Sequence, residues 1–290
     1  MQAKLIVFSS IYGSTMSDLL NDKQQRPLIT SASNQEIKRL RSLHERKYRK
    51  QTGWFLAEGL RICTEALQQG FAPKRLLYEE DRNRDPLISN LISSWEKEGG
   101  RVLPVTRSLL VKVSNKDNPQ TVIGAYAQFA TSFSNILEEK IRCWVALDRI
   151  RDPGNLGTII RTIDAVAADG IILIDNCTDP FSIESVRASM GAIFSLKISY
   201  CNTDEFLAFR KKFPGKIIGT SLKSNIDYKT ADWKSPCVIL MGNEQSGLSN
   251  KLGDACDQLI TMPMRGRSDS LNLAVATGIS LYEFLRHEAN

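Results

Sequence analysis

Three polar segments in the second half of the sequence contain side chains that could bind or activate a substrate. Each segment directly follows an apolar run that is predicted to be a β-strand. Ligands of open α/β sheets bind at the carboxyl ends of the strands. These segments are therefore the first places in which to look for a functional site.

The first segment, residues 152–161, contains Asn155, Gly157 and Arg161. Its proline and two glycines predict a tight turn from strand to helix, with Asn155 as the helix N-cap. We expect Arg161 on the second turn of that helix, with its guanidinium directed at whatever binds there. An ordinary helix cap and a surface arginine are the plainer interpretation of the same residues.

The second segment, residues 242–249, has the glycine spacing of a phosphate-binding loop. Leu248, however, stands where such a loop requires lysine, and Glu244 would repel a phosphate. A nucleoside triphosphate site is therefore disfavoured. A glycine-lined cradle for a neutral or cationic ligand, such as the sulfonium S-adenosylmethionine, fits better.

The third segment runs from Met262 to Ala276. Pro263 predicts the end of a strand, and Gly266 permits a sharp turn. Ser270 is placed to cap the last helix, whose small residues would let another backbone approach closely. A capped helix that packs on the sheet is the alternative interpretation.

Histidine and cysteine offer little chemistry. The six cysteines are far apart and form no C-x-x-C pair, so we expect buried, reduced thiols and no metal site. The only histidines, His44 and His287, lie near opposite ends of the chain. A histidine-based triad is therefore not expected.

The elements that must position the three segments alternate between strands and helices. In the first half we expect strands at 54–58, 75–79, 101–105 and 121–129, and helices at 59–69, 86–98 and 106–113. In the second half we expect strands at 143–148, 170–175, 195–200, 216–220, 237–241 and 258–262, and a last helix at about 270–287. Buried runs separated by helices predict a mostly parallel sheet.

The chain of 290 residues is long enough for two domains. We predict an N-terminal extension at 1–30, a small α/β RNA-binding domain at 31–130, a linker at 131–140 and a larger α/β domain at 141–290. No apolar run approaches the roughly 18 residues of a membrane helix, and a secretory signal is not evident. We therefore expect a cytoplasmic protein; the alternative for the extension is an organelle transit peptide.

The net charge of +6 arises mainly in the first domain. Ser33 and Glu36 have the spacing of a capping box, and Ile37, Leu40 and Leu43 would share the buried side of a helix. Basic residues would then face outward to meet RNA phosphates: Lys38, Arg39, Arg41, Arg46, Lys47, Arg49 and Lys50. A solvated helix face is the alternative.

In this order, the three segments resemble the signature motifs of the SpoU/TrmH family of SPOUT RNA methyltransferases. The family motifs are N-x-G-x-x-x-R, then G-x-E-x-x-G, then a proline-containing strand end followed by S-L-N. They are matched by Asn155, Gly157 and Arg161, by Gly242, Glu244 and Gly247, and by Pro263, Ser270, Leu271 and Asn272. The resemblance covers about 142–288, with Met262 where isoleucine is usual. Residues 54–59 also resemble the family's substrate-binding domain.

The resemblance implies a parallel sheet with a C-terminal trefoil knot, a rare exception to the usual topology rules. It implies that S-adenosylmethionine lies bent in the knot against Gly242, Met262 and Leu271. It also implies a homodimer whose active site is completed across the interface.

For the reaction, the resemblance implies a key role for Arg161. Arginine stays protonated, so we expect it to stabilise the developing alkoxide rather than act as a base. Asn155, Ser270 and Asn272 would orient the sugar and Arg161, and Glu244 would hold Asn155 or Arg161.

The implied function is methylation of a ribose 2′-hydroxyl in RNA, with ribosomal RNA favoured by the two-domain layout. The alternatives are a transfer RNA 2′-O-methyltransferase, a base methyltransferase, and a non-catalytic RNA-binding assembly factor. The intact motifs argue against the last of these.

Overall fold

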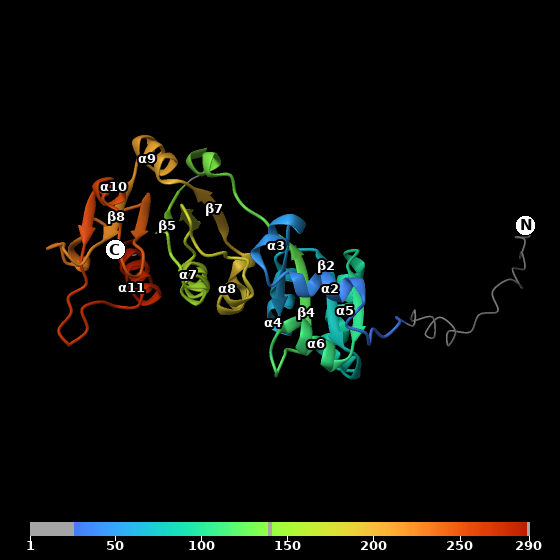
Figure 1. Ribbon diagram of the computed structural model, residues 1–290. Helices are drawn as coiled ribbons and strands as arrows, with labels where there is room; N and C mark the ends of the chain where they lie inside the picture. Colours follow the sequence, from blue (N-terminus) through green and yellow to red (C-terminus); the bar gives the residue numbers. More distant parts are fainter. Residues whose placement is uncertain (1–25, 139–140, 289–290) are drawn as a thin grey trace, which may run out of the picture.

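Two α/β domains lie side by side in the computed structural model, which describes residues 26–138 and 141–288 (Figure 1). The first domain has a four-stranded sheet of order β1-β4-β2-β3, in which β4 is antiparallel to both of its neighbours. Its strands are β1 (Trp54–Glu58), β2 (Pro73–Glu79), β3 (Arg101–Val105) and β4 (Val122–Ala127). Its helices are α2 (Gln35–Ser42), α3 (Arg46–Thr52), α4 (Leu60–Gln68), α5 (Pro86–Lys97) and α6 (Arg107–Ser114).

Helix α5 illustrates why these segments form where the sequence predicts them. Asp85 caps the helix by accepting a hydrogen bond from the backbone N–H of Leu87, and Pro86 occupies the first helical position. The apolar residues recur at helical spacing and all face the core: Ile88, Leu91, Ile92 and Trp95. The strands and helices predicted for this domain are confirmed, and each predicted end lies within two residues of the observed end.

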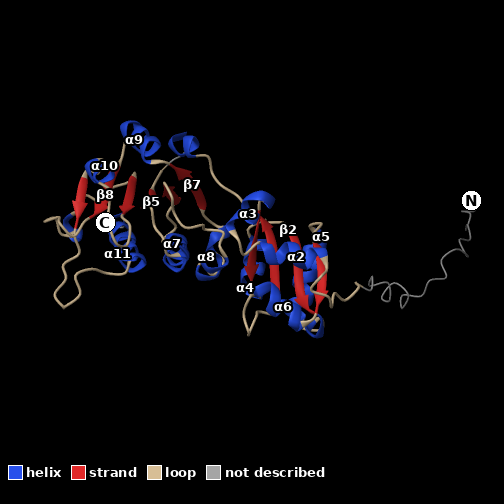
Figure 2. Ribbon diagram, viewed as in Figure 1, coloured by secondary structure: helices blue, strands red, loops and turns tan. Residues whose placement is uncertain are grey.

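The second domain has a six-stranded sheet of order β10-β8-β9-β5-β6-β7. All neighbouring strands are parallel, which confirms the predicted mostly parallel sheet. Its strands are β5 (Cys143–Asp148), β6 (Gly170–Ile174), β7 (Lys197–Cys201), β8 (Lys216–Thr220), β9 (Cys237–Met241) and β10 (Gln258–Ile260). Its helices are α7 (Pro153–Ala165), α8 (Ile183–Ala188), α9 (Thr203–Lys212), α10 (Asn250–Asp254) and α11 (Leu273–Glu288). Helices α7, α8 and α11 cover one face of the sheet, and α9 and α10 cover the other (Figure 2).

The order of the strands creates a point at which the direction of chain travel reverses. From β5 the chain adds β6 and β7 on one side, and it later returns to place β8 and β9 on the other side. The loops after β5 and β9 therefore leave the sheet next to each other, since Leu147 lies opposite Met241. Open α/β sheets bind ligands at such a reversal.

An aromatic cluster joins the two domains. Phe55 and Tyr126 of the first domain pack against Phe181 and Phe194 of the second, with centroid distances of 4.9 Å for both Phe55–Phe181 and Tyr126–Phe194. Aromatic residues bury large apolar surfaces, and these belong to one continuous core cluster. The packing therefore fixes the first domain against the second.

The segment predicted as a linker also packs on the second domain. Residues Phe133–Glu138 form a 3₁₀ helix in which Ile136 is fully buried, and the N–H of Thr131 donates to the carbonyl of Ile198 in β7. The described part of this segment therefore forms part of the second domain. The sequence predicts only a linker between the two domains.

Most of the predicted N-terminal extension, residues 1–25, lies outside the described residues. Its last residues belong to the first domain: Ile29 pairs in parallel with Val105 at the edge of the sheet, and Arg26 forms an ion pair with Glu96. No helix in the described ranges is long and apolar enough to cross a membrane.

The basic region contains two short helices, α2 and α3, where one was expected. The expected capping box was wrong, because Asn34 rather than Ser33 is the N-cap and accepts from the N–H of Glu36. The side chain of Glu36 binds Arg75 instead. The predicted buried side is confirmed, since Ile37, Leu40 and Leu43 are at most 2% exposed.

Candidate functional site

Three of the predicted site residues, one from each motif, meet at the carboxyl edge of the parallel sheet. The side-chain amide of Asn272 donates to Oδ1 of Asn155 at 2.9 Å, and the amide of Asn155 donates to Oε1 of Glu244 at 3.4 Å. These residues are 117 and 89 positions apart in sequence. The fold therefore assembles a polar chain, Asn272–Asn155–Glu244, from the three loops.

The N-terminus of α7 leaves Asn155 free to make these contacts. Asp152, and not Asn155 as expected, is the N-cap, and its carboxylate accepts from the backbone N–H of Asn155 at 2.6 Å. Glu244 also accepts from the backbone N–H groups of Arg151 and Asp152, each at 3.3 Å. A carboxylate at this end of a helix is stabilised by the helix dipole and the unpaired N–H groups.

The two glycines after Asp152 do not form the tight turn that was expected. Both lie inside α7. A Cβ on Gly157 would lie 2.3 Å from the carbonyl oxygen of Ser185 and 2.6 Å from Cβ of Ala188. Gly157 therefore permits close packing of α7 on α8.

The glycines of the second motif shape the loop that carries Glu244. A Cβ on Gly242 would lie 2.3 Å from the backbone nitrogen of Leu248, and Gly247 has φ of +67°. Asn243 stabilises the turn by accepting from the N–H groups of Gln245 and Ser246. The loop thus folds back on itself, which only glycine at position 242 allows.

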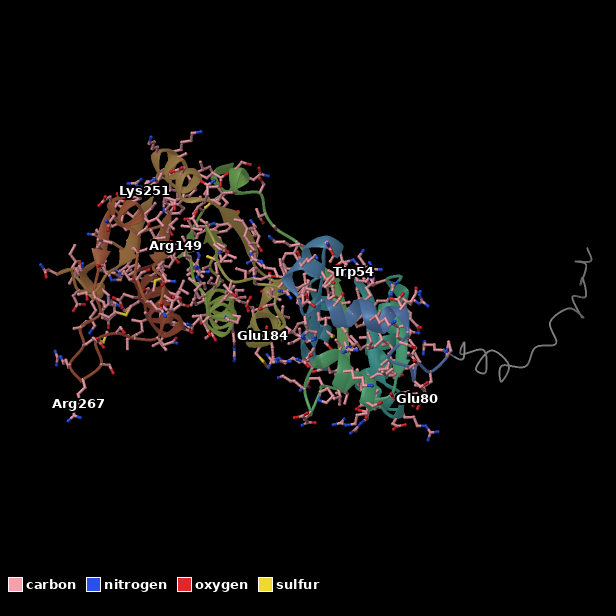
Figure 3. The ribbon with its side chains drawn as sticks, viewed as in Figure 1. Trp54, Glu80, Arg149, Glu184, Lys251 and Arg267 are labelled. Carbon is pink, nitrogen blue, oxygen red and sulfur yellow. The ribbon has the colours of Figure 1, made fainter. Side chains whose placement is uncertain are left out.

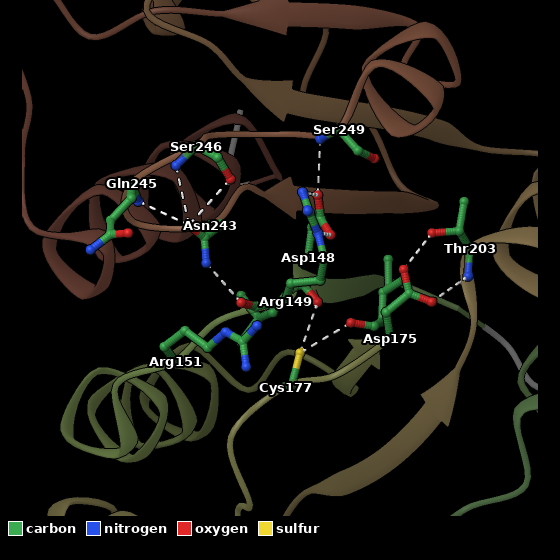
Figure 4. Close-up of polar contacts among 12 residues, drawn as sticks. Asp148, Arg149, Arg151, Asp175, Cys177, Thr203, Asn243, Gln245, Ser246 and Ser249 are labelled. Atoms are coloured by element: carbon green, nitrogen blue, oxygen red, sulfur yellow. Dashed lines mark hydrogen bonds and ion pairs between the residues drawn. The ribbon is translucent and has the colours of Figure 1, made fainter.

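A buried carboxylate ties this loop to the loop after β5. Asp148 is fully buried; it pairs with Arg149 at 2.7 Å and accepts from the N–H of Ser249 at 3.0 Å (Figure 4). The hydrogen bonds that the Arg149 guanidinium donates to Asp148 raise the pKa of Arg149. Asn243 donates to the carbonyl of Arg149 at 2.8 Å. Sequence reasoning missed Asp148 and Asn243, although a polar residue at the end of a buried strand is a usable signal.

The third motif begins the last helix in a different way from that expected. Asn272, and not Ser270, is the cap: its Oδ1 accepts from the N–H groups of Ala274 at 2.9 Å and Val275 at 3.3 Å. Asn272 therefore caps α11 with its oxygen and contacts Asn155 with its nitrogen. Ser270 is exposed in the loop before it.

The residues expected to hold the cofactor lie along the same edge of the sheet. Gly242 follows β9, Met262 follows β10, and Leu271 precedes α11 with 39% of its side chain exposed. Arg267 marks the tip of the loop between β10 and α11, which projects away from the sheet (Figure 3). An exposed apolar side chain and the backbone of loops at the carboxyl ends of strands suit the adenosine part of a ligand. The residues therefore fit S-adenosylmethionine.

Sequence reasoning missed the loop after β8 as part of this edge. Strand β8 lies between β10 and β9, so its carboxyl end opens between Met262 and Gly242. The N–H of Ser221 donates to the carbonyl of Ile260, and Leu222 is 65% exposed. The polar residues after this strand were the available signal.

Arg161 lies apart from the polar chain. It is on the third turn of α7 rather than the second, and in the described ranges its side chain has no hydrogen bond to Asn155, Glu244 or Asn272. Instead it lines a cleft of about 340 Å³ at the junction of the domains. Arg61 of α4 lines the same cleft.

Six of the seven predicted RNA-binding residues are exposed on α2 and α3: Lys38, Arg39, Arg41, Arg46, Lys47 and Lys50. Arg39 stacks over the ring of Trp54 at 3.9 Å. The prediction that Arg49 faces outward was wrong, because it is 3% exposed and bound to Asp179 of the second domain. The break between α2 and α3 turns it inward.

The cysteines are all free, and all but Cys256 are buried. Burial raises the pKa of Cys63 to about 12 and that of Cys177 to about 11. Such thiols remain protonated and are poor nucleophiles. Among the described residues no group of three or more histidine, cysteine or acidic side chains could hold a metal ion.

Each of the two domains matches the model of a known protein family. Residues 142–282 match the model of the SpoU rRNA Methylase family, and residues 34–124 match that of the MRM3-like substrate binding domain. A 23S rRNA (uridine(2479)-2′-O)-methyltransferase of Streptomyces viridochromogenes is 31% identical over 251 residues, which cover 84% of this chain and 86% of the relative. The Bacillus subtilis 23S rRNA (guanosine(2553)-2′-O)-methyltransferase RlmP is 29% identical over 88% of this chain and 97% of its own length.

A solved structure supports the same relationship. The AdoMet-bound rRNA methyltransferase from Sinorhizobium meliloti is 42% identical, with a TM-score of 0.84, and the match covers 91% of this chain and 98% of that one. Family models and relatives thus agree with the three motifs and with the sheet that positions them. The chain belongs to the SpoU rRNA methylase family.

Proposed function

We propose that this protein transfers the methyl group of S-adenosylmethionine to the 2′-hydroxyl of a ribose in ribosomal RNA. The observation that carries the proposal is the hydrogen-bonded chain Asn272–Asn155–Glu244, which unites the three motifs beside the predicted cofactor residues. The relatives from Streptomyces viridochromogenes and Bacillus subtilis are named as 23S rRNA 2′-O-methyltransferases. The Sinorhizobium meliloti relative is described with AdoMet bound.

S-adenosylmethionine supplies an electrophilic methyl group when bound. Gly242, Met262 and Leu271 would hold its adenosine part at the edge of the sheet. The amides of Asn155 and Asn272 would then orient the ribose, and Ser270 would add a hydroxyl beside them. Fixed donors of this kind raise the rate by positioning the attacking oxygen.

Glu244 serves as a positioning residue in this scheme. Its oxygens already accept from the side chain of Asn155 and from the backbone N–H groups of Arg151 and Asp152. These contacts connect Glu244 both to the side chain of Asn155 and to the backbone that enters α7. We therefore assign Glu244 to holding Asn155 and the start of α7 in place.

Arg161 would stabilise the negative charge that develops on the 2′-oxygen as its proton leaves. Neither histidine is placed to act as a base at the site: His44 is hydrogen-bonded to the carbonyl of Val113, and His287 contacts Glu283. Arginine cannot act as a base at neutral pH. Its preorganised charge instead favours the anionic transition state.

We also propose a homodimer formed through the outer face of α11. Val275 and Tyr282 are 51% and 57% exposed, and with Ile279 they form one stripe, since residues 275, 279 and 282 follow helical spacing. Exposed apolar stripes of this kind mark interfaces. Tyr282→Lys is expected to convert the dimer to a monomer in analytical ultracentrifugation, and a wild-type monomer would contradict the proposal.

The path of the chain supports the trefoil knot implied by the family. After β10 at the edge of the sheet, the chain returns to α11, which packs on α7 and β9 near the middle. We propose that this return passes through the loop between β8 and β9.

The decisive experiment is to map methylated nucleotides in ribosomal RNA from a deletion strain. We expect one 2′-O-methyl group to be lost and to be restored by the purified protein, but not by its Asn155→Ala variant. Loss of a base methyl group, of a methyl group in transfer RNA, or of no methyl group would contradict the proposed function.

A further inference from the structure

We propose that the cleft between the two domains is a preformed subsite for RNA, in which Arg61 of the first domain and Arg161 of the second bind the phosphodiester backbone beside the target ribose. This inference rests on the proposed function. It adds a residue of the substrate domain to the active site of the same chain.

The walls of the cleft come from both domains. Helix α4 contributes Arg61 and Glu65, Gln69 directly follows that helix, and helix α7 contributes Arg161 and Asp164. The volume of about 340 Å³ is at the lower end of the range for small-ligand sites, which is about 300 to 1,000 Å³. A segment of nucleic acid backbone is therefore a suitable occupant.

The two walls are held at a fixed separation. Arg187 of α8 forms an ion pair at 2.5 Å with Glu58 of β1, whose side chain is 1% exposed. A second ion pair, at 2.8 Å, joins Arg49 of α3 to Asp179. Separating the domains would leave one buried charge of each pair without its partner, namely the side chains of Glu58 (1% exposed) and Arg49 (4% exposed), which is costly. The cleft therefore exists before RNA binds.

A close contact of Glu65 brings α4 to the second domain. A Cβ on Gly191 would lie 1.7 Å from Oε2 of Glu65, and Gly191 has φ of +102°. The φ of Gly191 favours glycine, and the absence of a side chain there leaves room for the carboxylate of Glu65. Arg61, one helical turn before Glu65, is thereby placed at the mouth of the cleft.

The charges in the cleft favour a phosphate. The acidic side chains already have partners: Glu65 accepts from Arg61 at 3.0 Å, and Asp164 accepts from the hydroxyl of Ser195. In the described part of the chain, Arg161 has no ion pair or side-chain hydrogen bond. It is thus a cation available for an anionic ligand.

Arg61 can exchange its partner at little cost. Its side chain is 71% exposed, and an exposed pair at i,i+4 spacing contributes little to stability. Guanidinium groups bind phosphate oxygens through two directed donors. Among the described lining residues none is aromatic, so the cleft offers no platform for a stacked base. These features select the RNA backbone over a nucleobase.

The test compares three single variants of the full chain: Arg61→Gln, Glu65→Gln and the control Arg82→Gln. Arg82 is an exposed arginine of the same domain outside the cleft. Binding of an unmodified 23S rRNA transcript is measured as a function of salt, together with single-turnover methylation and cofactor affinity. Arg61→Gln and Glu65→Gln break the same ion pair, but only the first removes a cation.

We expect Arg61→Gln to reduce the slope of log K against log salt by about 1, as for the loss of one phosphate contact. It should also lower kcat/KM roughly tenfold, since a hydrogen bond to a charged group is lost. Glu65→Gln should leave RNA binding unchanged or tighten it. All three variants should bind the cofactor like the wild type.

Equal weakening by Arg61→Gln and Glu65→Gln would overturn the proposal, because the ion pair would then be merely structural. Equal behaviour of Arg61→Gln and Arg82→Gln would overturn it as well. Failure of the proposed function is distinguishable, because it would appear as a wild-type product other than a 2′-O-methylated ribose. The comparison of RNA binding among the variants does not depend on that product.

Discussion

Arg49 donates from both Nε and Nη2 to Oδ2 of Asp179, at 2.9 and 2.8 Å, and this contact joins the first domain to the second. The remaining nitrogen, Nη1, donates to the carbonyls of Leu43 and His44 at 2.8 and 2.7 Å. The planar guanidinium is thus satisfied on all sides at a position that is 3% exposed. Lysine has no such fork of donors, so the contact is specific to arginine.

We expect Asp179→Asn to lower the free energy of unfolding by about 3–5 kcal/mol, because Arg49 would be left as a buried, uncompensated charge. Denaturant unfolding monitored by tryptophan fluorescence measures this change. The salt dependence of RNA binding should stay as in the wild type, because no exposed cation is removed.

Lys50→Gln is the matched control for this prediction. Lys50 is exposed on the same helix, so the substitution should leave stability nearly unchanged and reduce the salt slope of RNA binding by about 1. If Asp179→Asn were as stable as Lys50→Gln, the ion pair would not hold the domains together.

The two atoms of the Asn272 side-chain amide have separate roles, which substitution can distinguish. Asn272→Ala removes the cap of α11 and should lower the free energy of unfolding by about 1 kcal/mol. Asn272→Ser retains a capping oxygen but loses the donor to Asn155. We therefore expect Asn272→Ser to be nearly as stable as the wild type and yet slow in methyl transfer.

Thermal unfolding and single-turnover methylation measure the two effects of substitution at Asn272. Near wild-type methylation by Asn272→Ser would show that the contact with Asn155 does not contribute to catalysis. The capping role would stand in that case, since the stability of Asn272→Ala tests it independently.

Gly157 is expected to be intolerant of a methyl group. In Gly157→Ala the new Cβ would lie 2.3 Å from the carbonyl oxygen of Ser185, so α7 and α8 must separate. Overpacking of this kind costs about 1–3 kcal/mol, measurable by denaturant unfolding. Gly253→Ala is the control, because a Cβ at Gly253 meets no atom within 4 Å. An equal effect of both substitutions would contradict the packing argument.

The strands, the helices and the polar chain could be predicted because each depends on local patterns. Buried runs identify the strands, and residues that follow parallel strands must meet at one edge. This rule predicts that the three loops share one edge, and the family resemblance identifies Asn155, Glu244 and Asn272 within them. The loop after β8 obeys the same rule and was missed because its residues match no motif.

What could not be predicted depends on tertiary contacts. Asp152 and Asn155 are both good N-cap residues, and only the path of the backbone selects Asp152. Arg49 looks like its neighbours in the sequence, because its partner, Asp179, is 130 residues away. The cleft near Arg161 likewise requires the packing of one domain on the other, which no local pattern encodes.

We expect Arg161→Ala to abolish methyl transfer while sparing the fold and the affinity for the cofactor. The cofactor sulfonium and the Arg161 guanidinium are both cationic, so Arg161 is not expected to bind the cofactor. The anion that needs stabilisation is the 2′-oxygen, together with the neighbouring phosphate in the cleft.

A preorganised donor of this kind is worth about 3–4 kcal/mol, or roughly 100- to 1,000-fold in rate. Arg161→Lys should rescue poorly, because a point charge on a flexible stem cannot replace two directed donors. Single-turnover methylation, measured beside cofactor affinity for both variants, tests the argument. If Arg161→Ala lost activity only in proportion to lost cofactor binding, Arg161 would be a residue of the cofactor site, and its assignment to the RNA side of the reaction would be wrong.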